Sequence, residues 1–153
     1  MKVICVSGTP GTGKTTLAKF LSKKKDYTLI DVNQIIKQNK LNNKYDKKRK
    51  CNIIDIKKLN KTLIKLIKQN KKDKKNIIID SHLSHYLPKK YVDLCIITKT
   101  ELKILEKRLK KRKYSKAKIR ENLDSEIFDV CLNEAKEFKH NIRVIDTSKK
   151  KLK

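Results

Sequence analysis

The sequence predicts an α/β fold: a doubly wound parallel sheet of five strands flanked by helices, in a single domain of residues 1–153. Short continuous apolar runs, rich in isoleucine and valine, indicate strands that are buried on both faces of a sheet. Segments with apolar residues at helical spacing separate these runs, and the alternation favours parallel strands joined by helical crossovers. The predicted strands are residues 3–6, 27–31, 76–80, 92–98 and 141–146.

Three helices are predicted in the first half of the chain. One begins near Thr15, and a short one spans residues 32–39. Asp55 is placed to cap the next helix, because a carboxylate there accepts hydrogen bonds from the first turn. The apolar residues of this helix recur opposite a lysine-rich face, and they are Ile56, Leu59, Leu63 and Ile67. The polar residues 40–52 are expected to form a long loop, and such loops are usually functional.

Two more helices are predicted in the second half, separated by a break at residues 113–115. The first covers residues 101–112 and has one apolar stripe, formed by Leu102, Leu105 and Leu109. The second is long, from about residue 116 to 139, and its recurring apolar residues are Ile119, Leu123, Ile127 and Val130. Both patterns predict amphipathic helices.

A glycine-rich loop, Gly8-Thr-Pro-Gly-Thr-Gly-Lys-Thr-Thr16, joins the first strand to the first helix. It fits the P-loop pattern of Gly, four residues, Gly-Lys-Ser/Thr, in which backbone N–H groups converge on phosphate at a helix N-terminus. Lys14 would reach the β- and γ-phosphates, while the hydroxyls of Thr15 and Thr16 are placed for Mg²⁺ and the α-phosphate. All 3 glycines of the chain lie in this loop. The motif therefore predicts a nucleoside triphosphate site rather than an ordinary turn.

The chain is strongly basic, with 42 lysine and arginine residues, 16 acidic residues and a net charge of +26. Such a charge attracts polyanions such as RNA, and a solvated lysine-rich surface is the alternative explanation. No apolar run approaches the roughly 18–20 residues that span a bilayer, and no room is left for a signal peptide before the first strand. No membrane role is expected. The expected location is the cytoplasm, or the nucleus in a eukaryotic source.

The 4 cysteines lie far apart, at Cys5, Cys51, Cys95 and Cys131. They show neither the Cys-x-x-Cys spacing of zinc sites nor the pattern of a disulfide framework. Cys5 and Cys95 fall in strand-like runs, so both are expected to be small buried hydrophobic residues.

Polar residues follow the third predicted strand. Asp80 ends this strand, where P-loop proteins keep the carboxylate that holds Mg²⁺, although a strand-terminal aspartate also serves as a turn or cap residue. His82 follows on the loop, where it would orient a water or a phosphate, or satisfy a loop hydrogen bond. His82 and His85 share a His-x-x-His spacing. Without a third and a fourth ligand in the sequence, a transition-metal site is disfavoured.

Arginine is rare in this lysine-rich chain, and three arginines lie close together at Arg108, Arg112 and Arg120. Guanidinium groups pair bidentately with phosphate oxygens, whereas lysine offers a point charge. The group is therefore predicted to contact phosphate, and a solvated helix face is the alternative.

Together these residues resemble the adenylate kinase isoenzyme 6 family, also described as the coilin-interacting nuclear ATPase type, which has archaeal members. The resemblance covers nearly the whole chain. Besides the P-loop it rests on three blocks, which are Asp80-Ser-His82 with Tyr86-Leu-Pro88, Glu106-Lys-Arg108-Leu-Lys-Lys-Arg112-Lys-Tyr-Ser115, and Arg120-Glu-Asn122 with Glu126-Ile-Phe-Asp-Val130.

The resemblance implies a nucleoside monophosphate kinase fold of the P-loop NTPase class. Residues 32–55 would form a small monophosphate-binding segment and residues 111–121 the lid. Carried over by position, the residues that hold ATP are Gly11, Gly13, Lys14, Thr15, Thr16, Arg112 and Lys150. The implied catalytic residues are Lys14, Asp80, His82 and Arg112, and the implied Mg²⁺ ligands are Thr15 and Asp80. Relatives commonly have glycine at the position of Lys113, so the lysine is expected to stiffen lid closure.

The resemblance also implies an activity. Family members transfer the γ-phosphate of Mg·ATP to AMP or another nucleoside monophosphate, and they also hydrolyse ATP. They are implicated in maturation of the small ribosomal subunit, with pre-ribosomal RNA and a platform protein of that subunit (its universal eleventh protein) as expected partners. The alternatives are an ATPase assembly factor that ATP releases from a ribosomal protein, with kinase activity incidental, and a plain RNA-binding module.

Overall fold

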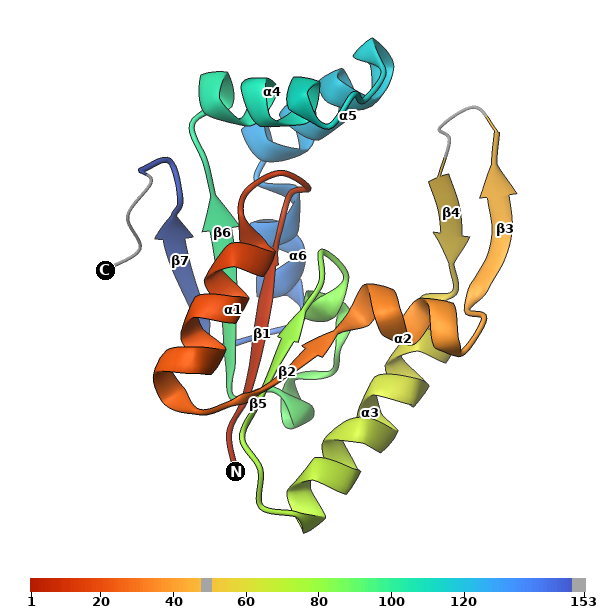
Figure 1. The fold of residues 1–153 in the computed structure, drawn as a ribbon, viewed down its shortest axis with the longest axis vertical. Coiled ribbons are helices and arrows are strands. Elements are labelled where there is room, and N and C mark those ends of the chain that lie inside the picture. Colours follow the sequence, from red (N-terminus) through yellow and green to blue (C-terminus); the bar gives the residue numbers. More distant parts are fainter. Residues whose placement is uncertain (48–50, 150–153) are drawn as a thin grey trace.

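The computed structural model describes residues 1–47 and 51–149, and it confirms the predicted α/β architecture. The central sheet has five parallel strands in the order β2–β5–β1–β6–β7 (Figure 1). The bounds of the strands are Val3–Gly8 for β1, Thr28–Asp31 for β2, Ile77–Asp80 for β5, Leu94–Lys99 for β6 and Ile142–Asp146 for β7. The glycine-rich loop thus leaves the middle strand of the sheet.

Helices cover both faces of this sheet. They are α1 (Lys14–Lys25), α2 (Val32–Gln38), α3 (Ile56–Lys72), α4 (Leu102–Lys111), α5 (Lys116–Ile127) and α6 (Val130–Glu137), with short 3₁₀ helices η1 (Ser84–Tyr86) and η2 (Lys89–Tyr91) after β5. α1 packs against one face of β1, and α3 and α6 pack against the other. Because both faces are covered, β1 and β5 are buried along their whole length, as their continuous apolar runs predict.

The predicted capping and core of α3 are confirmed. The side chain of Asp55 accepts a hydrogen bond from the backbone N–H of Lys58 at 3.1 Å. Three of the predicted apolar residues of α3 are fully or almost fully buried in the core, and they are Leu59, Leu63 and Ile67. A long lysine-rich face on the other side of the helix stays in solvent.

The loop predicted for residues 40–52 is wrong, because part of it forms a β-hairpin. β3 (Asn42–Asp46) and β4 (Cys51–Ile54) pair antiparallel in a small sheet of their own. Tyr45 is 58% exposed and Ile53 is 50% exposed. Among the side chains that the structure describes in these strands, the apolar residues do not form the buried, alternating face that marks a strand in a sequence.

The single long helix predicted for residues 116–139 is also wrong. α5 ends at Ile127 and α6 begins at Val130, with Asp129 between them at a φ of 53°. A left-handed residue interrupts the helical hydrogen bonds and turns the chain. Ile127 and Val130 consequently lie 49% and 37% exposed instead of continuing the inward stripe. Leu102, also predicted to point inward, is 42% exposed at the start of α4.

Left-handed backbone recurs at the ends of helices. Asp26 follows α1, and four lysines with positive φ follow α2, α3, α4 and α6, namely Lys40, Lys74, Lys113 and Lys139. This conformation usually selects glycine, but the 3 glycines of the chain are all in the P-loop. The chain therefore uses charged residues where other proteins use glycine.

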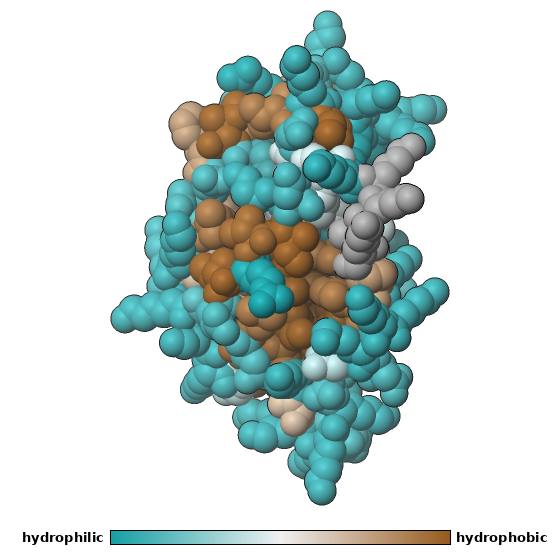
Figure 2. Space-filling view, turned by 90° about the vertical axis from the view of Figure 1, so that its left-hand side faces the viewer, coloured by the Kyte–Doolittle hydropathy of each residue, from teal (hydrophilic) through white to brown (hydrophobic). Residues whose placement is uncertain are grey.

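The surface is mostly hydrophilic, as its lysine content requires. A patch of apolar side chains interrupts it on the side of the molecule where the edge strand β7 lies (Figure 2). Within residues 1–47 and 51–149, no helix is both long and apolar enough to cross a membrane.

Candidate active site

The P-loop connects the end of β1 to the first turn of α1 (Figure 1). α1 begins at Lys14, directly after Gly13, whose φ is 82°. No side chain caps this helix end, since Gly13 has none. The first N–H groups of a helix have no partner within it, so this end is a ready anion site.

Two glycines of the loop are required by space as well as by backbone conformation. A Cβ atom on Gly8 would lie 2.5 Å from Thr98 Oγ1, and one on Gly11 would lie 2.8 Å from a methyl carbon of Leu105. Both residues have positive φ, at 139° and 93°. The loop is therefore packed tightly against β6 and α4, and larger residues would displace it.

Hydrogen bonds from distant segments hold the loop from behind. The hydroxyl of Thr9 donates to Glu126 Oε2 at 2.6 Å, and that of Thr12 donates to the carbonyl of Thr9 at 2.7 Å. The hydroxyl of Thr147 donates to the carbonyl of Thr12 at 2.6 Å. All four residues are buried. The sequence did not predict these supports, because polar residues in a P-loop and in later helices carry no signal that they pair.

A cavity of about 800 Å³ opens in front of the P-loop. The loop contributes Gly11, Gly13, Lys14, Thr15 and Thr16, and the end of β5 with the segment after it contributes Asp80, Ser81 and His82. Asn33 of α2 and Ile54 of β4 line it from a second side, and Arg112, Tyr114 and Lys118 line it from the region of α4 and α5. The structure thus brings the ATP-binding, catalytic and Mg²⁺-binding residues that the resemblance implies to one cavity, except Lys150, which lies outside the described residues.

Lys14 lies at the base of this cavity. Its ammonium group donates a hydrogen bond to the carbonyl of Thr9 at 3.0 Å. Burial lowers the pKa of Lys14 to about 8, although the nearby Cys131 and Asp80 oppose the shift. A cation held in a partly buried hollow is poised to gain from an anionic ligand, which would replace the water it has lost.

Asp80 and Thr15 come together although 65 positions separate them in the chain (80 minus 15). Asp80 ends β5 beside Val6 of β1 and Asp31 of β2. Burial raises the pKa of the Asp80 carboxyl, and a hydrogen bond from the Thr15 side chain partly offsets this. A carboxylate and a hydroxyl side by side are oxygen donors of the kind that Mg²⁺ prefers.

His82 and His85 have different surroundings. His82 is open to solvent in the wall of the cavity. Desolvation by the nearby protein, followed by the charge of Lys14, lowers the pKa of His82 to about 4. His85 is instead buried, with Nδ1 2.7 Å from Ser7 Oγ. The ring of His82 is therefore neutral at pH 7, and the two histidines do not face the cavity together.

The three clustered arginines have different surroundings in the structure, and their contact with phosphate stays a prediction. Arg112 lines the cavity. Arg108 donates to the carbonyls of Thr147 at 2.8 Å and Gly11 at 3.4 Å, and so supports the P-loop from outside. Arg120 forms an exposed ion pair with Asp124, one turn along α5, at 3.0 Å.

A parallel sheet whose middle strand leads through a glycine loop into a helix, with an acidic residue on the neighbouring strand, defines a P-loop nucleotide-binding protein. A family model described as an AAA domain matches residues 4–129. The "Adenylate kinase isoenzyme 6 homolog" of Dictyostelium discoideum is 35% identical over 137 residues, which are 87% of this chain and 73% of that protein. The chain belongs to this family of adenylate kinase isoenzyme 6 and its archaeal homologues.

The archaeal branch of the family is equally similar. A protein of Methanosarcina barkeri named "Putative adenylate kinase" is 38% identical over 150 residues, which are 98% of this chain and 79% of that protein. Among solved structures, an unliganded sugar kinase from Janibacter sp. superimposes with a TM-score of 0.62 at 16% identity, over 95% of this chain and 85% of that one. This low identity speaks for a shared kinase fold only.

Proposed function

We propose that the protein transfers the γ-phosphoryl group of Mg·ATP to AMP, with hydrolysis of ATP as a second outcome. One observation carries the proposal: a single cavity of about 800 Å³ has the P-loop and Asp80 on one side and Asn33 and Ile54 on another. A cavity of this size accommodates two small ligands side by side. The family names of the relatives favour an adenine nucleotide kinase.

Different segments around the cavity would bind the phosphate acceptor and close over the phosphate donor. Residues 32–55, which include α2 and the β3–β4 hairpin, would bind the monophosphate. Residues 111–121 would form the lid that brings Arg112 over the phosphates and excludes water. Asn33 and Ile54 on one side and Tyr114 on the other already line the cavity, which supports this assignment.

Transfer to a phosphate acceptor needs no general base, because the attacking oxygen is already anionic. Catalysis then consists of holding the two phosphates in line and stabilising the charge that develops between them. Gly11, Gly13 and Thr16 would bind the phosphates of ATP through the loop. Lys14 and Arg112 would approach the transferred group from opposite sides of the cavity.

The residues present fit a magnesium ion. Thr15 and Asp80 offer a hydroxyl and a carboxylate that already share a hydrogen bond, and both line the cavity beside the loop. These two residues would hold the ion, which when bound neutralises charge on the phosphate oxygens. Asp31 adds a second carboxylate near Asp80, and its charge contributes to raising the pKa of that residue.

Hydrolysis requires a water molecule to be oriented, and His82 is the residue we assign to it. Its imidazole is neutral at pH 7, because its pKa is lowered to about 4, so one ring nitrogen is free to accept a hydrogen bond. The ring lies in the cavity wall next to Asp80. This position favours an ATPase activity alongside the kinase reaction.

The net charge of +26 supports work close to RNA. We propose that the protein takes part in maturation of the small ribosomal subunit, with a ribosomal protein of that subunit and pre-ribosomal RNA as partners. The second candidate function is then an assembly factor that ATP releases from its ribosomal partner, with AMP phosphorylation incidental.

Release of ADP and inorganic phosphate from Mg·ATP, with and without AMP, tests the proposal. We expect AMP to be consumed with two ADP formed for each AMP, and Lys14→Ala to lower this rate by at least about 100-fold. His82→Ala is expected to reduce phosphate release more than nucleotide binding. Lys23→Ala, which removes an exposed lysine at the far end of α1, is the matched control and is expected to behave as wild type.

Two outcomes would redirect the assignment. Phosphate release that ignores AMP would contradict the kinase proposal and favour the assembly factor. Equal loss of binding and hydrolysis in His82→Ala would remove the catalytic role of that residue.

A further inference from the structure

A cluster of ligand-type side chains lies behind the P-loop, between η1 and α6. One ring nitrogen of His85, the thiol sulfur of Cys131 and a carboxylate oxygen of Glu134 all lie within 4.8 Å of one another. None of the three residues lines the cavity in front of the loop. The proposed kinase reaction therefore leaves them without a role.

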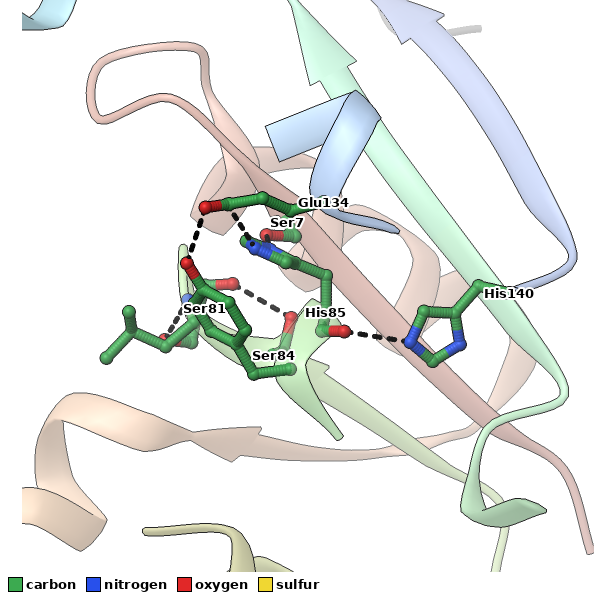
Figure 3. A network of polar contacts seen from close by, with 8 residues as sticks. Ser7, Ser81, Ser84, His85, Glu134 and His140 are labelled. Carbon is green, nitrogen blue, oxygen red and sulfur yellow. Dashed lines mark hydrogen bonds and ion pairs between the residues drawn. The ribbon is translucent and has the colours of Figure 1, made fainter. Parts of the chain in front are cut away.

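His85 is held in place on both sides of its ring (Figure 3). Nδ1 lies 2.7 Å from Ser7 Oγ, and Nε2 lies 2.8 Å from Glu134 Oε2. The hydroxyl of Tyr86 donates to the other carboxylate oxygen of Glu134 at 2.7 Å. The His85 side chain is 1% exposed. Such outer hydrogen bonds fix the ring and tautomer of a histidine that binds a metal.

Cys131 and Glu134 come from one helix. They are three positions apart in α6, so they project from the same face, one turn from each other. That face meets η1, where His85 supplies the nitrogen. Imidazole, thiolate and carboxylate together are the ligand set of zinc and related ions, whereas Mg²⁺ prefers oxygen alone.

We propose that His85, Cys131 and Glu134 bind one divalent transition-metal ion, with zinc the best fit. Three protein ligands leave a fourth tetrahedral position for water. The Glu134 side chain is 30% exposed and Cys131 is partly exposed, so an ion has a route to the buried histidine. Cys131 also shares a side-chain hydrogen bond with Thr9, which places the ion directly behind the P-loop.

Binding of the ion moves one proton between the ring nitrogens of His85 and releases one proton from Cys131. A neutral His85 that binds the ion through Nε2 carries its proton on Nδ1 and donates it to Ser7, whose hydroxyl then accepts. The hydrogen bond from Nε2 to Glu134 is replaced by two bonds to the same ion. The thiol of Cys131 loses its proton to solvent, so binding releases about one proton for each ion.

Titration of the nucleotide-free protein with Co²⁺ tests the site. A cobalt–thiolate bond gives a charge-transfer band in the near ultraviolet, and tetrahedral cobalt gives strong visible bands. We expect saturation at one ion per chain and displacement by Zn²⁺ but not by Mg²⁺. Cys131→Ser is expected to abolish the thiolate band and to weaken binding at least about tenfold.

Matched variants separate this site from other ligands of the chain. Cys95→Ser, which changes a thiol in β6, is expected to keep the band. Tyr86→Phe removes only the hydrogen bond to Glu134, so it is expected to keep the band and weaken binding about tenfold. Glu134→Gln removes the carboxylate ligand and is expected to weaken cobalt binding at least about tenfold, which gives a second measurement if Cys131→Ser folds poorly, as judged by circular dichroism.

The proposal is overturned if cobalt binding does not saturate in the wild-type protein. It is equally overturned if the thiolate band persists in Cys131→Ser. Neither result depends on nucleotide turnover, so both are independent of the kinase assignment.

Discussion

The two sides of the P-loop use similar residue types in opposite ways. In front, polar side chains face a cavity, and they are Lys14, Thr15, Asp80 and His82. Behind, polar side chains are buried and hydrogen-bonded to one another or to the loop, and they are Ser7, Thr9, Thr12, His85 and Glu126. Residue type alone therefore does not distinguish a ligand-binding group from a supporting one.

Burial has opposite results on the two sides because the partners differ. Behind the loop, each buried hydroxyl or carboxylate has a protein partner. Its burial therefore costs little free energy, and its position is fixed. In front, desolvation shifts the pKa of Lys14 down to about 8 and raises that of Asp80. Groups whose charged forms are disfavoured in the free protein are the ones that a charged ligand can restore.

The largest expected change in stability lies behind the loop, at Glu126. Its carboxylate accepts from the Thr9 hydroxyl at 2.6 Å and from the backbone N–H of Thr100 at 3.0 Å. Glu126→Ala leaves both donors buried without a partner, and we expect a loss of about 2–4 kcal/mol in the free energy of unfolding. Chemical denaturation measures it.

An acidic residue on the same helix provides the control. Asp124→Ala removes only the exposed ion pair with Arg120 and is expected to cost less than about 0.5 kcal/mol. Equal losses of unfolding free energy in the two variants would contradict the supporting role assigned to the buried residues behind the loop.

Removing the charge of Asp80, in front of the loop, is expected to raise the stability of the folded protein instead of lowering it. Because its folded pKa is raised above the ordinary 3.8, ionised Asp80 destabilises the folded protein at neutral pH. Asp80→Asn should therefore raise the melting temperature of the nucleotide-free protein at pH 7, while phosphoryl transfer falls at least about 100-fold. The gain shrinks as the pH falls through the raised pKa and vanishes below the ordinary value, where the wild-type residue is neutral in both states.

Thermal unfolding between about pH 3 and 8 measures this dependence. Asp26→Asn, which changes an exposed aspartate after α1, is the control and is expected to leave activity unchanged. A lower melting temperature for Asp80→Asn at pH 7 would mean that Asp80 supports the fold, as the residues behind the loop do.

The smallest expected effect is at Lys113, beside the cavity-lining Arg112. Lys113 has a φ of 56°, which costs a lysine more than a glycine. Lys113→Gly is expected to stabilise the protein by about 0.5–1 kcal/mol and to ease closure of the proposed lid. Lys107→Gly in the interior of α4 is expected to destabilise by a similar amount. Melting temperatures that fall in both variants would contradict the strain at Lys113.

The front of the loop was predictable from the sequence because its signals are local. The P-loop is nine consecutive residues, and Asp80 ends a run of isoleucines. The strand, the motif and the carboxylate could therefore each be predicted from a short stretch of neighbouring residues. The back was not predictable, because its pairs join distant positions. Thr9 and Glu126 are 117 positions apart, and His85 and Glu134 are 49 apart.

The errors in the fold have the same origin. The β3–β4 hairpin pairs only with itself within the described residues, so its apolar residues do not alternate toward a core. The turn between α5 and α6 depends on Asp129 in a left-handed conformation with an ion pair to Lys99. Neither an aspartate nor a lysine predicts such a turn from the sequence, whereas a glycine at this position would have indicated it.

The lysines that follow four of the helices make those helix ends sensitive to ionic strength. Left-handed backbone costs a lysine about 1–2 kcal/mol. Each of these lysines, however, follows the C-terminal end of its helix, which is the negative end of the helix dipole, and a positive charge there contributes about 0.3–1 kcal/mol at low salt. Lys40, Lys74, Lys113 and Lys139 all hold such positions. Added salt screens the favourable contribution and leaves the conformational cost. The C-terminal ends of these four helices are therefore expected to become less stable as the ionic strength rises.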